Sequence, residues 1–221
     1  FELNDIVQYK KLFESAFSTK HVIIFGANTL GGSNKYYNSL IAIDKDFKKL
    51  YKYNKKKLVP FGEFLPLESL FSQIGLKKIT QGYGSFSKGD KQKNFYLKNL
   101  NILPLICYEI IFTELTQKAE IKTNLIVNIS EDAWFGDSIG PYQHFSSAIF
   151  RAIEKNTYVA RATNKGVSAF INNKGIIISS LKPKEAGNIE LNIPIINKNS
   201  KNKNDLIFFI LLITYLLIFL I

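Results

Sequence analysis

The sequence predicts an α/β protein built on a mixed β-sheet, followed by a membrane-spanning helix at the C-terminal end. Short apolar runs typical of buried strands alternate with segments whose apolar residues have helical spacing. The Asn-Asn-Lys-Gly sequence at residues 172–175 separates two such runs and is typical of a hairpin turn. Residues 206–221 are apolar except for one threonine and one tyrosine. With 221 residues, 46% of them hydrophobic, the chain can bury one sizeable core.

The first half of the chain is predicted to hold one helix and several strands. Apolar residues near one face predict the helix at residues 1–17. Loops are predicted at residues 54–64, where Pro60 and Gly62 interrupt regular structure, and at 80–93, which are rich in Gly, Ser and Lys. Residues 64–76 are apolar without a regular period. Runs typical of strands lie at 21–25, 36–43, 50–53, 95–97 and 102–106.

The second half begins with a buried-type strand at 125–129, apolar except for Asn128, which leads into an unusual loop at 130–141. This loop holds two glycines, a proline and the only tryptophan, a composition that indicates a functional site. Pro141 suits the first turn of a helix. The helix carries a core-facing stripe formed by Phe145, Ala148, Ile149, Ala152 and Ile153. Further strands are predicted at 158–162, 167–171, 176–180 and 189–195.

Three segments follow from this pattern: a domain at residues 1–196, a polar, lysine-rich linker at 197–205 and a helix at 206–221. At about 1.5 Å per residue the last segment reaches roughly 24 Å, slightly less than the roughly 30 Å of a hydrocarbon core. A buried helix is therefore one interpretation. We predict a transmembrane helix instead, because the segment is terminal, apolar on every side and preceded by a polar linker.

The net charge of +11 comes almost entirely from lysine, because 29 − 2 = 27 basic residues are lysines and only Arg151 and Arg161 are arginines. Abundant Asn and Ile beside Lys indicate a broad coding bias, whereas a nucleic-acid groove would use Arg with interleaved aromatics. Nucleic acid is therefore not an expected partner, and an anionic membrane surface is a better match. His21 and His144 are interpreted as structural or local hydrogen-bonding residues, and without a zinc-type cluster no metal or cofactor is expected.

Cys107, the only cysteine, is the residue around which the chain is organised. The apolar run 102–106 leads into it and a segment of helical character, 108–119, leads away, which predicts a strand-to-helix elbow. A thiol at such a bend is pushed towards a substrate, and the free N–H groups of the following helix favour the thiolate. The alternative is that this cysteine is a small buried hydrophobic residue.

Three motifs, one of which contains Cys107, follow one another along the chain. Lys55 lies in Tyr-Asn-Lys-Lys-Lys-Leu-Val-Pro-Phe-Gly-Glu, and Cys107 lies in Leu-Ile-Cys-Tyr-Glu. The third motif, at residues 134–145, reads Trp-Phe-Gly-Asp-Ser-Ile-Gly-Pro-Tyr-Gln-His-Phe and is followed by Arg-Ala-Thr-Asn-Lys-Gly at 161–166. Together they resemble the catalytic domain of the apolipoprotein N-acyltransferase family, a membrane-bound branch of the nitrilase, or carbon–nitrogen hydrolase, superfamily. The resemblance implies a nitrilase-like α-β-β-α sandwich with a Glu-Lys-Cys triad.

The resemblance also implies roles for individual residues. Cys107 resembles the nucleophile, Lys55 the triad lysine and Glu63 a second essential acid. A thiolate can attack an ester carbonyl, an ammonium can stabilise the oxyanion, and a carboxylate can hold that ammonium. Lys55 could instead be a solvated member of a lysine triplet, and Glu63 could be a loop anchor. The residues expected to line the substrate site are Tyr108, Glu109, Trp134 and Phe135.

By resemblance the reaction is an acyl transfer in two steps. The cysteine takes an acyl chain from a phospholipid, typically phosphatidylethanolamine, as a thioester. The amine of the N-terminal diacylglyceryl-cysteine of an apolipoprotein then receives that chain. The family implies a monomer in the bacterial inner membrane, with the catalytic domain facing the periplasm. The lysine-rich linker opposes this orientation by the positive-inside rule, but we follow the resemblance because a general lysine bias blurs the charge signal.

Two departures from the family pattern stand out. Ser130-Glu131-Asp132 replaces the usual Ser-Asn-Asp, and the general base, a glutamate in a Trp-Pro-Glu segment, does not occur in these residues. The chain also contains no methionine. We therefore expect a C-terminal fragment that lacks N-terminal strands of the sandwich and is inactive alone; neither Glu2 nor Glu14 has the context of the base. Two alternatives stay open: a soluble amidase of the superfamily, or an inactive, membrane-anchored remnant of a split gene.

Overall fold

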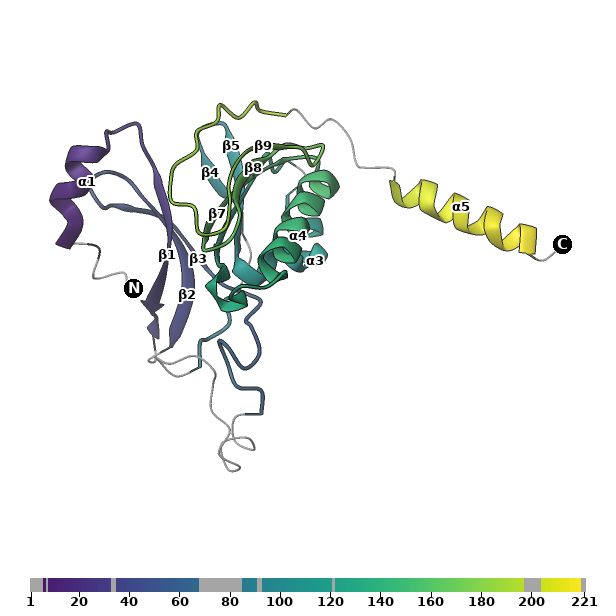
Figure 1. Ribbon diagram of the computed structural model, residues 1–221, viewed down its shortest axis with the longest axis horizontal. Helices are drawn as coiled ribbons and strands as arrows, with labels where there is room; N and C mark the ends of the chain where they lie inside the picture. Colours follow the sequence, from purple (N-terminus) through teal and green to yellow (C-terminus); the bar gives the residue numbers. More distant parts are fainter. Residues whose placement is uncertain are drawn as a thin grey trace.

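The computed structural model contains two β-sheets packed face to face, with helices on both outer faces (Figure 1). It describes residues 6, 8–32, 35–67, 85–90, 93–120, 122–196 and 204–219. The first sheet is antiparallel in the order β1 (Ile23–Leu30), β2 (Tyr36–Ile43) and β3 (Lys49–Asn54). The second runs in the order β4 (Phe95–Leu97), β5 (Leu100–Ile106), β6 (Leu125–Glu131), β7 (Tyr158–Asn164), β8 (Ser168–Ile171) and β9 (Ile177–Leu181).

The parallel centre of the second sheet determines where its loops meet. β5, β6 and β7 run parallel, and the other pairs in that sheet are antiparallel. The carboxyl ends of the three parallel strands therefore lie side by side at one edge of the sheet, the place where α/β proteins commonly build their sites.

Alternating side chains of the strands fill two separate cores. In β5, Ile102 and Ile106 face the other sheet, where they pack with Ala42, Leu40 and neighbouring side chains. Leu103 and Leu105 point the opposite way, into a core shared with α4 (Gly140–Lys155) and α3 (Thr113–Gln117). This period of two is what a strand buried on both faces requires.

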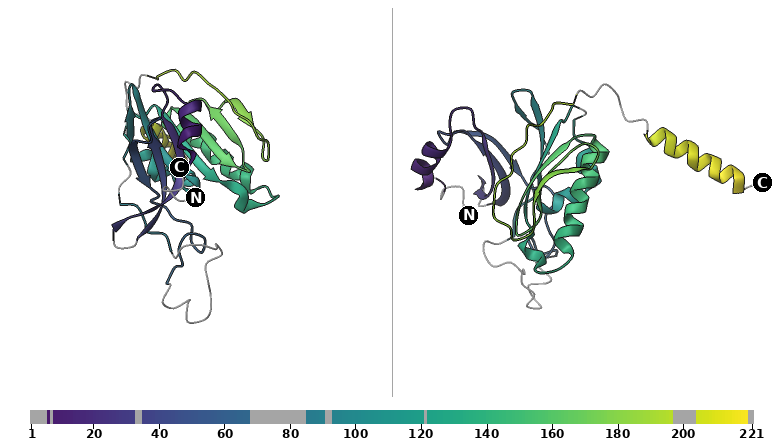
Figure 2. Two further views of the ribbon diagram at one scale, coloured as in Figure 1. Left: turned by 90° about the vertical axis from the view of Figure 1, so that its left-hand side faces the viewer. Right: turned by 45° about the horizontal axis from the view of Figure 1, so that its top comes forward.

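The outer face of the first sheet is covered near the N-terminal end. Ile41 and Ile43 of β2 pack with Ile6, and Phe13 of α1 (Lys10–Ala16) lies against the same cluster. Two views show the resulting order of layers, with α1 beyond the first sheet and α4 beyond the second (Figure 2). The predicted nitrilase-like α-β-β-α sandwich is therefore confirmed.

Most predicted elements are present, and the deviations have local causes. The predicted helix at 1–17 is shorter within the described residues, where α1 begins at Lys10. The strand predicted at 189–195 is wrong: these residues join neither sheet, and Pro194 has no N–H with which to pair. In α4 the stripe is buried at Phe145, Ala148 and Ala152, but Ile153 is exposed. The predicted segments 64–76 and 80–93 and the linker 197–205 lie largely outside the described residues.

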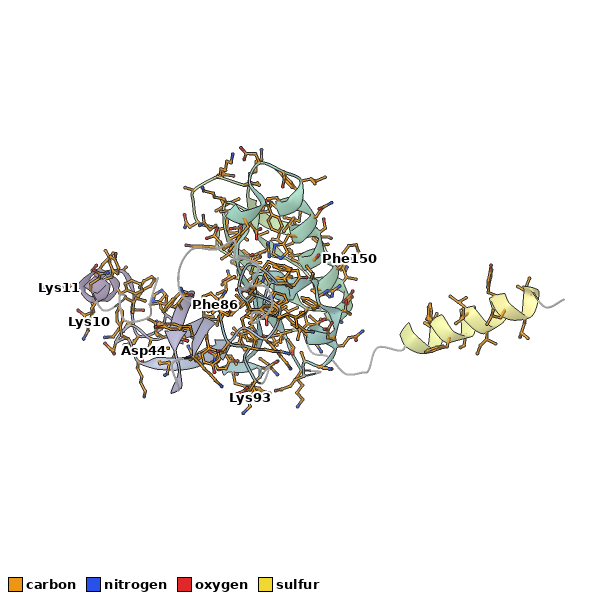
Figure 3. All side chains as sticks on the ribbon, turned by 90° about the horizontal axis from the view of Figure 1, so that it is seen from below. Lys10, Lys11, Asp44, Phe86, Lys93 and Phe150 are labelled. Carbon is orange, nitrogen blue, oxygen red and sulfur yellow. The ribbon has the colours of Figure 1, made fainter. Side chains whose placement is uncertain are left out.

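The C-terminal helix, α5 (Asn204–Phe219), lies apart from the sandwich, and its side chains at positions 207–218 stand out from the helix on all sides (Figure 3). Among the described residues, no helix combines the length and the apolar character that crossing a membrane demands. This corrects the prediction of a spanning helix at 206–221. The apolar helix is present, but its 16 residues cover only about 24 Å at about 1.5 Å per residue.

Candidate active site

Cys107 lies at the bend between β5 and a short 3-10 helix, η3 (Cys107–Ile111). Its φ of 49° is in the left-handed region, which costs a residue with a Cβ on the order of 1–3 kcal/mol. The side chain is half-buried, and its Sγ lies 4.0 Å from the backbone oxygen of Glu131, at the end of β6. The predicted elbow is therefore confirmed. The helix beyond it is shorter than predicted, because residues 108–119 divide into η3 and a separate α3.

Lys55 directly follows β3 and is almost fully buried, with 1% of its surface exposed. Its Nζ lies 2.7 Å from Oε2 of Glu63, so the ammonium group is held in a buried ion pair. Glu63 also accepts hydrogen bonds from Asn38 Nδ2 at 2.7 Å and from the backbone N–H of Val59 at 2.8 Å. The interpretation of Lys55 as a solvated residue is therefore wrong, and Glu63 anchors its loop as well as the lysine.

The neighbouring lysines have different surroundings. Lys57 pairs with Glu114 at 2.7 Å on the surface, and its ammonium lies 4.8 Å from the centre of the Phe112 ring. Lys56 is half-buried. Since only the first lysine of the triplet, Lys55, is held in a buried ion pair, the three residues are not equivalent.

Glu109 is fully buried two residues after the nucleophile. Its carboxylate is fully buried and accepts from four donors: Tyr53 Oη at 2.8 Å, Lys56 N at 2.6 Å and Lys57 N at 3.1 Å on Oε1, and Ile106 N at 2.8 Å on Oε2. Burial raises the pKa of the Glu109 carboxyl, while the donated hydrogen bonds act in the opposite direction. These four donors give the Glu109 carboxylate a structural role, while its contact with substrate stays a prediction.

The Glu109 carboxylate joins the two segments that carry the predicted catalytic groups. Two of its partners are the backbone N–H groups of the residues that follow Lys55, and another is the N–H of the residue before Cys107. One buried carboxylate thus fixes the loop of the lysine against the elbow of the cysteine.

Replacing Glu109 by Gln is expected to lower the free energy of unfolding by about 1–3 kcal/mol. The amide oxygen of the glutamine can replace one carboxylate oxygen as an acceptor. The amide NH₂ group replaces the other oxygen and cannot accept, so a backbone N–H group loses its partner. The matched control is Glu114→Gln, an exposed partner of Lys57, which should change stability by less than about 1 kcal/mol. Denaturant unfolding of both variants measures the difference, and equal effects would contradict the structural role assigned to Glu109.

The aromatic residues predicted to bind substrate lie at the surface near the elbow. Trp134 and Phe135 belong to a 3-10 helix, η4 (Asp132–Phe135), which directly follows β6, and their exposed fractions are 54% and 39%. Tyr108 follows the cysteine and makes an edge contact with Phe112, with 4.9 Å between the ring centres. Because β5 and β6 are parallel neighbours, these rings border the end of the sheet at which Cys107 lies.

Sequence reasoning missed a buried polar cluster behind the elbow, formed by Asp132, His144 and Arg161. His144 Nδ1 lies 3.0 Å from Asp132 Oδ1, and Arg161 Nη2 lies 2.7 Å from Asp132 Oδ2. Ser130 Oγ donates to the same carboxylate at 2.6 Å, and Arg161 also contacts Asn128, its register partner across β6 and β7. The sequence signal for this cluster was limited to Asn128 and Arg161, which are polar residues inside apolar parallel strands.

The charges of this cluster are mutually stabilised. Burial acts to raise the pKa of Asp132, but the hydrogen bond from His144 and the charge of Arg161 outweigh it, so that this pKa lies below its ordinary value. Burial lowers the pKa of Arg161, while Asp132 and the nearby Cys107 act to raise it. A Cβ at Gly166 would lie 2.1 Å from Asp132 Oδ2, which explains a glycine at this position of the third motif.

Glu131, the departure from the usual asparagine, has a local structural role. Its side chain accepts from the backbone N–H of Ala133 at 3.1 Å and from Asn164 Nδ2 at 2.8 Å. It therefore caps η4 and ties the ends of β6 and β7 together.

Two facing sheets flanked by helices form a carbon–nitrogen hydrolase class of fold. The chain belongs to the carbon–nitrogen hydrolase family, whose model matches residues 5–196. Similar solved structures share this fold. A carbon–nitrogen hydrolase from Helicobacter pylori has a TM-score of 0.62, 12% identity and coverage of 83% of this chain and 64% of that chain. An amidase from Nesterenkonia sp. has a TM-score of 0.59, 15% identity and coverage of 81% and 63%.

Among curated proteins, the chain is similar to apolipoprotein N-acyltransferases. The protein of Rickettsia prowazekii is 37% identical over 86% of this chain and 39% of its own length. The protein of Rickettsia typhi is 36% identical over 97% of this chain and 45% of its own length. The protein of Allorhizobium ampelinum is 41% identical over 69% of this chain and 29% of its own length. The chain therefore spans between 29% and 45% of the length of these relatives.

Proposed function

We propose that this chain is the acyl-transferring domain of an apolipoprotein N-acyltransferase, with Cys107 as the acyl carrier. The observation that carries the proposal is the joint anchoring of Lys55 and Cys107. The lysine is buried in an ion pair with Glu63, and the Glu109 carboxylate binds backbone next to both residues. The named relatives support the same reaction for the family.

In the first half-reaction the Cys107 thiolate attacks the ester carbonyl of a phospholipid acyl chain. A bond forms between Sγ and the carbonyl carbon, the ester C–O bond breaks, and the thiol proton ends on the hydroxyl of the released lysophospholipid. Lys55 stabilises the oxyanion of the tetrahedral intermediate, and loss of such a donor costs about 2.7–4 kcal/mol. Glu63, 2.7 Å from the lysine Nζ, holds that group in position.

In the second half-reaction the amine of a diacylglyceryl-cysteine attacks the thioester. An amide bond forms, the C–S bond breaks, and the proton lost by the amine returns the cysteine to a thiol. The general base that the resemblance implies is the glutamate of a Trp-Pro-Glu segment, which residues 1–221 do not contain. The inactivity of these residues alone stays a prediction.

The lipid substrate fits the exposed apolar side chains around the elbow. Trp134 and Phe135 lie on one side of the cysteine, and Phe61, which is 42% exposed, belongs to the loop that carries Lys55 and Glu63. We propose that these rings contact the acyl chain of the donor. The apolar surface of α5 supports attachment of the protein to a bilayer, in keeping with a monomeric, periplasm-facing enzyme of the bacterial inner membrane.

The test is transfer by the full-length protein in phosphatidylethanolamine vesicles with a synthetic diacylglyceryl-cysteine peptide. The expected result is N-acylated peptide and lysophospholipid in equal amounts. Release of ammonia from small amides, without acyl transfer, would instead support an amidase. The absence of both activities would support a non-catalytic remnant.

A further inference from the structure

His144 connects the buried polar cluster to the backbone of the nucleophile. Its ring is carried by α4 and is 5% exposed. Nε2 lies 3.1 Å from the carbonyl oxygen of Cys107, while Nδ1 faces Asp132 and Arg161. Nothing in the two half-reactions proposed above uses this histidine.

The partners of the ring require a proton on Nε2 in either charge state. Nε2 faces a carbonyl oxygen, which can only accept, so the 3.1 Å contact with Cys107 is a hydrogen bond only when Nε2 carries a proton. In the neutral form Nδ1 then accepts from Arg161 Nη2 at 3.1 Å. In the imidazolium form Nδ1 donates to Asp132 Oδ1 at 3.0 Å, and Nε2 is protonated as well. His144 therefore donates to the Cys107 carbonyl in both forms, and Asp132 and Arg161 fix the plane of the ring.

A hydrogen bond to this carbonyl fixes more than one atom. The described chain has no cis peptide bond, so the peptide between Cys107 and Tyr108 is planar and trans. Its N–H, which belongs to Tyr108, then points away from the carbonyl and away from His144. Because Tyr108 is in the first turn of η3, its N–H has no partner within that helix and can donate to another group.

We propose that His144 is a positioning residue for acylation of Cys107. By holding the Cys107 carbonyl, it fixes the peptide plane in which the Tyr108 N–H is directed at the oxyanion of the acyl intermediate, and it stabilises the left-handed backbone of the nucleophile. The inference rests on the proposed acyl transfer at Cys107. It adds a residue that acts through the backbone and touches neither the substrate nor the reacting atoms.

Two substitutions separate this role from general packing. His144→Gln places an amide NH₂ near the position of Nε2 and can still donate to the Cys107 carbonyl. His144→Asn places its amide near Nδ1, where it can bond to Asp132 but cannot reach the Cys107 carbonyl. His144→Met, which fills similar space without a donor, replaces the Asn variant if that variant does not fold.

Two reactions of the full-length protein provide the readout. Acylation of Cys107 by p-nitrophenyl butyrate passes through an oxyanion, whereas alkylation by iodoacetamide occurs at a saturated carbon and forms none. We expect the Asn variant to lose about 10–100-fold in acylation rate, because a misdirected donor forfeits much of its stabilisation. The Gln variant should stay within about threefold of the wild type, and both should be alkylated at nearly the wild-type rate.

Wild-type acylation rates in the Asn or Met variant would overturn the proposal. A parallel loss of acylation and alkylation would also overturn it, because that pattern indicates a disturbed thiol and not a misdirected oxyanion donor. The nitrophenyl ester makes the test independent of the lipid substrate. If this ester acylates Cys107 and phosphatidylethanolamine does not, the proposed lipid donor is wrong. The ratio of the acylation rates of the Gln and Asn variants still decides the role of His144.

Discussion

Replacing Cys107 by alanine is expected to abolish acyl transfer in the full-length protein, with a loss on the order of 10⁶ in kcat, as for other catalytic nucleophiles. The physical reason is that residues 1–221 contain one cysteine, so they offer no other thiol with which the acyl group could form a thioester. Binding of phospholipid should persist, because the aromatic side chains around the elbow are unchanged. The measurement is formation of N-acylated peptide from a labelled phospholipid.

A control variant keeps the shape of the elbow. Cys107→Ser retains a side chain of similar size at the same left-handed backbone, so that its unfolding should match that of the wild type. Because a hydroxyl is far less ionised than a thiol at neutral pH, its transfer rate should also be strongly reduced. Undiminished transfer by the Ala variant would show that the acyl chain is carried elsewhere.

Replacing Lys55 by methionine is expected to reduce kcat by about 10²–10³-fold, the effect of removing one oxyanion donor. It should also destabilise the protein by about 3–5 kcal/mol, because Glu63 is left as a buried charge without its partner. Adding Glu63→Gln to this variant should restore much of the stability, because the unpaired buried charge is removed, but it should not restore kcat. Comparing kcat and the unfolding midpoint of the single and double variants separates catalysis from stability.

The lysine triplet supplies its own controls. Lys56→Met and Lys57→Met alter side chains that are half-buried or paired at the surface, so each should leave kcat within a few-fold of the wild type. Equal losses in all three variants would contradict a special role for Lys55 and would indicate a basic patch.

The sequence predicted an element of the fold correctly wherever its apolar pattern fitted only one kind of secondary structure. The largely apolar runs of β5 and β6 leave little choice but strands buried on both faces, and the change to polar residues after Cys107 marks the elbow. The strand expected at 189–195 shows the limit of this reasoning. An alternating run was broken by Pro194, and only one face of it packs, through Ile193 against the core between the sheets.

The residues of the site were harder to predict from the sequence. The role of a charged residue depends on whether it is buried, and sequence spacing does not show burial. Nothing in a run of three lysines distinguishes the one that is held in a buried ion pair. Glu109, two residues after the nucleophile, has the position of a substrate contact and becomes a structural anchor only when its four donors are known. The partners of His144 lie far from it in sequence, at Cys107, Asp132 and Arg161.

The most direct test of the central claim is the mass of the Cys107 peptide after the full-length protein has been incubated with an isotopically labelled phospholipid and no acceptor. A labelled acyl chain on Cys107 that neutral hydroxylamine removes, and that moves to a diacylglyceryl-cysteine peptide when this is added, is the predicted result. Labelled acceptor that forms without label ever appearing on Cys107, or label on another residue, would contradict the assignment of this thiol as the acyl carrier.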